Sequence, residues 1–250
     1  MSNLTDSELA AQLAETAGRI LLEVRASGLV EGRALGKAGD ETSNAFLMEA
    51  LKAQRPEDAI LSEESKDDKS RLQQSRVWII DPVDGTREYG EGRTDWAVHV
   101  ALSIDGKAAL GAVALPGLDL VLRSDQPPAL KAMNTPPKML VSRSRPGKEA
   151  TAVAEMIGAE LLPMGSAGAK AMAVVRGEAD VYLHSGGQYE WDNCAPIAIA
   201  NAAGLHTCRM DGSDFVYNCD DTYLPDLLIC RPELAKQVRE AIDSLDLSET

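Results

Sequence analysis

The sequence predicts an α/β protein in which layers of helix and sheet alternate. Three observations lead to this fold class. Two amphipathic helices are predicted near the N-terminus, a run of short strands with a hairpin signal follows them, and strand and helix signals alternate beyond residue 138. No internal repeat and no low-complexity segment interrupts this plan.

The two predicted N-terminal helices rest on capping signals and on apolar spacing. Residues 5–8 (Thr-Asp-Ser-Glu) have the form of a capping box, and apolar residues follow at helical spacing as far as Val24. We therefore expect a first helix that ends near Gly28. A second helix is expected from about residue 42 to residue 54, because Pro56 stops it.

Short apolar runs bounded by turn residues predict the strands of the N-terminal part. They cover residues 59–62, 77–80, 97–104 and 108–115. The last two flank Asp105-Gly106, a dipeptide typical of tight β-hairpins. The sequence therefore predicts a sheet with at least one antiparallel pair.

A proline-rich segment marks the predicted boundary between two units. Four prolines fall between residues 123 and 138. We expect an N-terminal α/β subdomain over residues 1–124, a connection over 125–137 and a C-terminal α/β subdomain over 138–250. In the C-terminal subdomain, strands are predicted at 139–142, 160–163, 179–183, 205–210 and 226–230, and helices at 147–158, 167–177, 193–203 and 232–244.

The amino-acid composition narrows the classes of function that the chain could have. With 25 Lys and Arg against 39 Asp and Glu, the formal net charge is −14, which disfavours nonspecific binding to nucleic acid or anionic membrane. No signal peptide and no apolar run of membrane-spanning length is visible. The four cysteines show no metal-finger spacing. Free thiols in a reducing cytoplasm are therefore expected.

Three stretches place acids where strands or loops end: "LSEES" (61–65), "WIIDPVDGT" (78–86) and "YEWDNCAP" (189–196). Taken singly, Glu63 is a solvated turn residue, and Asp192 caps a helix that starts at Asn193. That explanation fails for Asp81 and Asp84, because the proline between them and the glycine after them should turn both carboxylates into one space. Like charges so close predict a bound cation.

Several carboxylates without nitrogen or sulfur ligands suit Mg²⁺, which completes its coordination with water and substrate phosphate. Two such ions sharing a carboxylate form a clamp for in-line phosphoryl transfer. Thr86 adds a hydroxyl that could orient a water molecule and a backbone N–H that could hold phosphate. The sequence thus favours a metal-dependent phosphatase.

The same stretches resemble those of the Mg²⁺-dependent, lithium-sensitive phosphatase superfamily that includes inositol monophosphatase and fructose-1,6-bisphosphatase. The resemblance implies an αβαβα sandwich. Finer motifs are similar to those of CysQ-type 3′(2′),5′-bisphosphate nucleotidases: Arg-Glu-Tyr after the DGT motif (87–89), "VSRS" (141–144) and "GSAGAKAMAVVRGEADVYLH" (165–184). The likeness covers about residues 6 to 230. A haloacid-dehalogenase phosphatase would need an aspartate where this chain has Pro82.

The resemblance implies a set of site residues. The metal ligands are Glu63, Asp81, Asp84, Asp192 and the carbonyl of Val83, around two or three Mg²⁺ ions. The catalytic residues are Asp40, which would pair with Thr86 to poise the attacking water, together with Thr86 itself and Glu63. The substrate contacts are Gly85, Thr86, Arg87, Ser142, Arg143, Gly165, Ser166, Lys170, Tyr182 and His184.

Some of these assignments have a plainer alternative. Lys170 matches a nucleotide-contacting lysine, whereas an arbitrary helix lysine would be solvated. Tyr182 could be a packed ring, and Asp180 beside it a strand-edge acid. His99 lies in the middle of an apolar predicted strand, so it is expected to be a structural histidine with no part in a metal site.

The function implied is hydrolysis of the 3′-phosphate of 3′-phosphoadenosine 5′-phosphate (PAP), and of its sulfated form PAPS, to give the 5′-nucleotide in sulfur assimilation. The alternatives are inositol monophosphatase, fructose-1,6-bisphosphatase or dual specificity within the same superfamily. From another class, the chain could be a catalytically silent nucleotide or metal sensor. The expected partner is a small phosphorylated nucleotide, and family analogy implies a homodimer.

Overall fold

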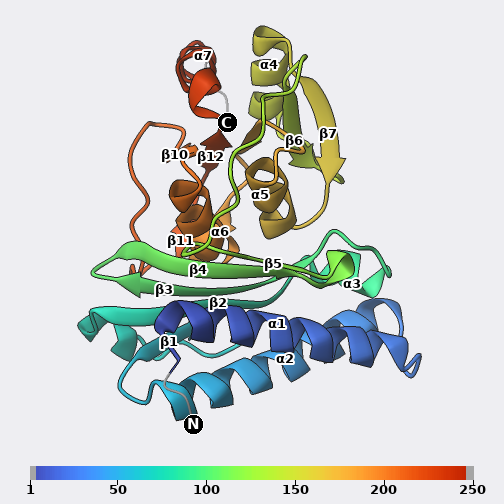
Figure 1. Cartoon of the computed structure of the whole chain (residues 1–250), viewed down its shortest axis with the longest axis vertical. Coiled ribbons are helices and arrows are strands. Elements are labelled where there is room, and N and C mark those ends of the chain that lie inside the picture. Colours follow the sequence, from blue (N-terminus) through green and yellow to red (C-terminus); the bar gives the residue numbers. More distant parts are fainter. Residues whose placement is uncertain (1–3, 246–250) are drawn as a thin grey trace.

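The computed structural model describes residues 4–245, and it confirms the predicted layering of helices and sheets. The layers follow an αβαβα order (Figure 1). One helix pair lies outside the first sheet, one lies between the two sheets, and one lies outside the second sheet. In that order the helices are α1 (Asp6–Ala26) and α2 (Gly32–Gln54), α5 (Ala167–Val175) and α6 (Glu190–Ala202), and α4 (Lys148–Ile157) and α7 (Pro232–Asp243).

The first sheet has the order β1-β2-β3-β4-β5. Its strands are β1 (Ala59–Ser62), β2 (Arg76–Asp84), β3 (Ala97–Ile104), β4 (Lys107–Leu115) and β5 (Leu120–Arg123). Only β1 and β2 pair in parallel. The predicted hairpin joins β3 to β4, and both Asp105 and Gly106 have positive φ, as a tight hairpin turn requires. The strand β5 was not predicted.

The second sheet has the order β10-β12-β8-β6-β7. Its strands are β6 (Lys138–Ser142), β7 (Glu160–Met164), β8 (Val181–His184), β10 (His206–Cys208) and β12 (Leu227–Cys230). A separate pair joins β9 (Gln188–Tyr189) to β11 (Tyr223–Leu224). The part of the chain that the structure describes also contains three short helices: η1 (Ser70–Gln73), α3 (Thr86–Gly90) and η2 (Pro116–Leu118).

The largest apolar core lies between the two sheets, around α5 and α6. A second core lies under α1 and α2, and a third lies under α4 and α7. We propose that the subdomains divide at the connection 125–137, because the first sheet ends at Arg123 and the second begins at Lys138. Buried Asp180 fixes this connection by accepting backbone N–H bonds from Asn134 and Lys138 at 3.1 and 2.9 Å.

Helix α2 begins ten residues earlier than the sequence predicts. Two glycines on its buried face interrupt the apolar pattern that predicts a helix, so its first turns were not predicted. A Cβ at Gly36 would lie 2.8 Å from Cγ2 of Thr86, and one at Gly39 would lie 2.6 Å from Cε1 of Tyr89. The helix therefore packs closely against α3, and Asp40 sits within it. Within residues 4–245, no helix combines the length and the apolar character needed to cross a bilayer.

Candidate active site

A bulge in β2 turns two acids to the same side of the first sheet. Asp81 pairs with His99 on β3, whereas Asp84 pairs with Ala97, so three steps along β2 match two along β3. Side chains alternate along a regular strand, and residues three apart would face opposite sides. The extra residue restores a common side for Asp81 and Asp84. Gly85, with a φ of +85°, then leads the chain away into α3.

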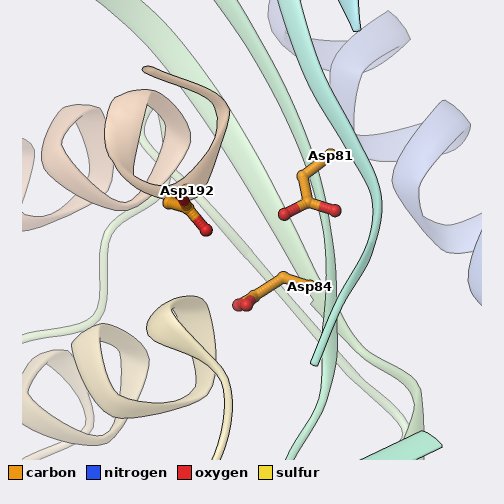
Figure 2. Close-up of side chains that lie close together, drawn as sticks. All are labelled: Asp81, Asp84 and Asp192. Atoms are coloured by element: carbon orange, nitrogen blue, oxygen red, sulfur yellow. The ribbon is translucent and has the colours of Figure 1, made fainter. Parts of the chain in front are cut away.

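Asp192 completes a cluster of three carboxylates. Oxygen atoms of Asp81, Asp84 and Asp192 lie within 4.8 Å of one another, and their side chains converge from β2 and α6 (Figure 2). Asp192 does not precede a helix that starts at Asn193, since α6 begins at Glu190. Its carboxylate accepts the backbone N–H of Tyr189 at 2.6 Å. The helix start and the strand end thus place the three acids around one space.

The electrostatics of the cluster favour a bound cation. Burial, followed by the charges of Glu63, Asp84 and Asp192, raises the pKa of Asp81 well above its usual value. Burial and the charge of Asp84 raise the pKa of Asp192 to about 6. Carboxylates with raised pKa values gain from a cation that offsets their charge. Clustered oxygen donors of this kind suit a hard divalent ion such as Mg²⁺.

Asp84 differs from its neighbours because donors surround it. Burial opposes its ionisation, but His99, Ser166 and the N–H of Gly168 lower its pKa to about 2. The hydroxyl of Ser166 donates to Oδ2, as does the N–H of Gly168 at 2.5 Å, and the N–H of Ala167 donates to Oδ1 at 3.0 Å. The start of α5 therefore holds Asp84 as a fixed anion.

Glu63 lies beside this cluster rather than within it. The parallel pairing of β1 with β2 sets Ser62 opposite Ile80, so the next residue, Glu63, comes alongside Asp81. The Glu63 side chain is exposed. Its partial removal from water and the charge of Asp192 raise its pKa to about 7, and it contacts the Asp81 carboxyl. Of the four predicted carboxylates, the structure gathers three and leaves Glu63 at the edge.

Asp40 and Thr86 face each other from α2 and α3. The Thr86 hydroxyl lies 3.2 Å from Oδ1 of Asp40 and 3.0 Å from the carbonyl oxygen of Val83. Burial and the charge of Glu64 raise the pKa of Asp40 to about 7. The sequence analysis did not identify Ser43, whose hydroxyl donates to the Pro82 carbonyl at 2.8 Å and ties α2 to the bulge.

Lys170 is buried, contrary to the alternative of a solvated helix lysine. Its ammonium group donates to the carbonyl oxygens of Gly165 and Ser166 at 3.3 and 2.5 Å and lies 5.2 Å from the centre of the Tyr182 ring. Burial lowers the pKa of Lys170. Tyr182 is itself 1% exposed, which makes it a support for Lys170 more than a surface for ligand contact.

The remaining predicted contacts are more dispersed. Arg143 is paired with Glu88 and Glu91 at 2.7 and 2.9 Å, and exposed Arg87 is also paired with Glu91. Nε2 of His184 lies 3.1 Å from the carbonyl oxygen of Gly187. The Ser142 hydroxyl accepts the N–H of Arg145 at 3.3 Å, and Gly165 donates its N–H to Asp95 at 2.7 Å. These residues stay predicted substrate contacts.

Similarity to known proteins extends over nearly the whole chain. A family model described as the inositol monophosphatase family matches residues 5–244. The 3′-phosphoadenosine 5′-phosphate phosphatase of Mycobacterium leprae is 49% identical over 94% of this chain and 92% of its own length. The 3′(2′),5′-bisphosphate nucleotidase CysQ of Salmonella typhimurium is 29% identical over 75% of this chain and 81% of its own.

Solved structures share the fold at low sequence identity. CysQ from Bacteroides thetaiotaomicron superposes with a TM-score of 0.79 at 23% identity, covering 90% of this chain and 97% of that one. The inositol monophosphatase from Anabaena sp. PCC 7120 gives a TM-score of 0.76 at 21% identity, covering 97% of both chains. At such identities the likeness concerns the fold alone.

Proposed function

The chain belongs to the inositol monophosphatase family, and from this premise we propose that it is a Mg²⁺-dependent phosphatase that removes the 3′-phosphate of PAP to give AMP. The observation that supports the chemistry is the cluster of Asp81, Asp84 and Asp192, with the Asp40–Thr86 pair on α2 and α3 beside the same turn. The substrate follows from the mycobacterial relatives, which are named PAP phosphatases.

The proposed metal ligands are the three clustered aspartates with Glu63 and the carbonyl of Val83. Mg²⁺ held there, as two or three ions, would lower the pKa of a bound water and neutralise charge on the phosphate. The carboxylates would serve as the oxygen donors that hold these ions. Because Thr86 already contacts the Val83 carbonyl, this turn joins the ligand set to the catalytic pair.

The Asp40–Thr86 pair is proposed to orient the attacking water. The Thr86 hydroxyl donates to Asp40, so a lone pair of its oxygen remains to accept a hydrogen bond from water. A pKa near 7 lets Asp40 take up a proton close to neutral pH. The backbone N–H groups of Gly85 and Thr86 are proposed to hold the phosphate that is cleaved.

Lys170 is proposed to contact the nucleotide. An ammonium group has three donors, and the carbonyls of Gly165 and Ser166 occupy two of them. The third could meet an anionic group of the substrate. Ser166, whose carbonyl accepts the Lys170 ammonium, also donates its hydroxyl to Asp84, so Lys170 is linked to the acid cluster through one residue. We further propose a cytoplasmic location, since all four cysteines are free. Formation of a homodimer stays a prediction.

Phosphate release from three substrates tests the proposed activity. PAP, inositol 1-phosphate and fructose 1,6-bisphosphate are compared at equal concentration, with Mg²⁺ and with EDTA. We expect PAP to give the highest kcat/KM, and EDTA to abolish release from every substrate. Faster turnover of inositol 1-phosphate would assign the chain to its family's other activity. Full activity in EDTA would refute the metal site.

Lys170→Met should impair PAP hydrolysis more than inositol 1-phosphate hydrolysis. Methionine keeps the unbranched apolar stem but removes the ammonium, so a nucleotide contact worth ~1.4–3 kcal/mol is lost. We expect kcat/KM for PAP to fall about 10- to 150-fold. Lys148→Met, at the exposed start of α4, is the control that should leave both substrates unaffected. Equal losses on both substrates would remove Lys170 from nucleotide recognition.

A further inference from the structure

His99 lies at the junction of the two segments that carry the acid cluster. It comes from β3, where it pairs directly with Asp81, and its side chain is fully buried. Nε2 lies 3.2 Å from Oδ2 of Asp84, which is within ion-pair distance. The two atoms do not, however, have the alignment of a hydrogen bond. Nδ1 lies 2.9 Å from the carbonyl oxygen of Trp191, the residue before Asp192. One ring therefore reaches both segments shown in Figure 2.

The glycine at the start of α5 leaves room for the His99 ring. A Cβ on Gly168 would lie 2.0 Å from Nε2 of His99 and 3.0 Å from Oδ2 of Asp84, so only glycine fits there. Glycine at this place lets the start of α5 close over both side chains. The N–H of Gly168 and the hydroxyl of Ser166 donate to the same carboxylate oxygen that faces His99. Asp84 is thus held from three directions.

A histidine that only filled core volume would not need both ring nitrogens on these two partners. Asp84 belongs to the first sheet, and Trp191 lies in the first turn of α6, between the sheets. The ring thus sets the side-chain direction of Asp84 relative to the first turn of α6, where Asp192 lies. Side chains that orient metal ligands typically change metal affinity 10- to 100-fold when they are replaced.

We propose that His99 is a positioning residue for the metal site: it holds Asp84 against the first turn of α6, so that Asp84 and Asp192 can bind the same divalent cation. The inference rests on the proposed function in one respect, that the acid cluster binds metal. It adds a residue that touches neither substrate nor metal. It also explains why glycine occupies position 168.

Direct metal binding by His99 variants tests this role. Mn²⁺ binding to the metal-free protein is measured by calorimetry and electron paramagnetic resonance, without substrate. In His99→Gln the terminal amide can reach the place of Nε2 and keep the contact with Asp84. In His99→Asn the amide can reach only the place of Nδ1, and His99→Leu removes both contacts. We expect the Kd for Mn²⁺ to rise about 10- to 100-fold in the Leu variant, which loses both contacts, and by a smaller factor in the Gln and Asn variants, each of which keeps only one.

Ser103→Ala is the matched control for folding effects. Ser103 lies on the same strand and is 1% exposed, and within residues 4–245 its hydroxyl has no hydrogen-bond partner. Its Kd for Mn²⁺ should equal that of the wild type. Thermal unfolding separates stability from metal affinity in every variant. Wild-type Kd values in all three His99 variants, or a Kd that follows only the loss of stability, would overturn the proposal.

Asp84→Asn separates failure of the inference from failure of the proposed function. If the wild type binds Mn²⁺ and Asp84→Asn does not, the metal site stands, and the His99 variants then decide the positioning role alone. If the wild type binds no Mn²⁺, or if Asp84→Asn binds it as the wild type does, the metal site and the role of His99 are both refuted.

Discussion

Asp81→Asn is expected to abolish phosphate release and, in the metal-free protein, to raise stability. The asparagine removes a negative charge from the acid cluster, so a divalent cation would lose a charged oxygen ligand there. Metal stabilisation of transition-state charge is worth several kcal/mol, and each 1.36 kcal/mol is tenfold in rate. We therefore expect kcat for PAP to fall by at least ~10³.

The gain in stability follows from the raised pKa of Asp81. Burial and three neighbouring acids favour its protonated form in the folded state. Ionising Asp81 in the folded protein costs stability. This cost is absent below the pKa of an unfolded aspartate, near 4, and it grows as the pH rises from there toward the folded pKa of Asp81. The gain from Asp81→Asn should therefore be absent near pH 4 and increase as the pH rises from there toward neutral. We expect Tm to rise by about 2–4 °C, which corresponds to about 1 kcal/mol.

Asp180→Asn provides the matched control. Both Asp81 and Asp180 are 1% exposed, but Asp180 accepts three hydrogen bonds from Asn134 and Lys138, whereas acids surround Asp81. Asp180→Asn should therefore lower Tm and leave turnover largely intact at temperatures where the variant is folded. Calorimetry in EDTA and phosphate release in Mg²⁺ measure the two quantities. An Asp81→Asn protein that is less stable than the wild type in EDTA would contradict the electrostatic argument.

Much of the fold and of the acid motif could be predicted because the signals are local. The capping box at residues 5–8 is present in the structure, and the Asp105-Gly106 hairpin forms as predicted. The convergence of Asp81 and Asp84 was also predicted, from the proline and glycine beside them. The feature that turns both carboxylates to one side is a bulge in β2, and it depends on how β2 pairs with β3. It could not be read from one strand.

Small or buried residues that act through distant partners were harder to place from the sequence. Gly36 and Gly39 weaken a helical pattern, but they are needed because Thr86 and Tyr89 pack against them. His99 was predicted to be structural because it lies in the middle of an apolar strand, and it is buried in β3; the register that sets it opposite Asp81 has no local signal. The plainer alternative set Asp192 before its helix because Asp is a common helix cap, whereas α6 begins at Glu190.

The Asp40–Thr86 pair should behave as one catalytic unit in a double-mutant cycle. Thr86→Ala removes the hydroxyl between Asp40 and the proposed water, whereas Asp40→Asn keeps an acceptor for that hydroxyl but removes the base that takes up the proton. General-base assistance is worth about 10²–10⁴ in rate, so each single variant should lose kcat by that amount. Once either partner is gone the other has no role, and the double variant should be no more than about threefold slower than the slower single variant.

Thr86→Ser controls for the shape of the site, since it keeps the oxygen and loses only the methyl group that packs against Gly36. It should retain at least about a third of wild-type kcat. All variants are assayed at saturating Mg²⁺, and Mn²⁺ binding confirms that the metal cluster is unchanged. Multiplicative losses in the double variant would show that Asp40 and Thr86 act independently. In that case Asp40, whose pKa lies near 7, would serve the reaction by a route that does not pass through the threonine hydroxyl.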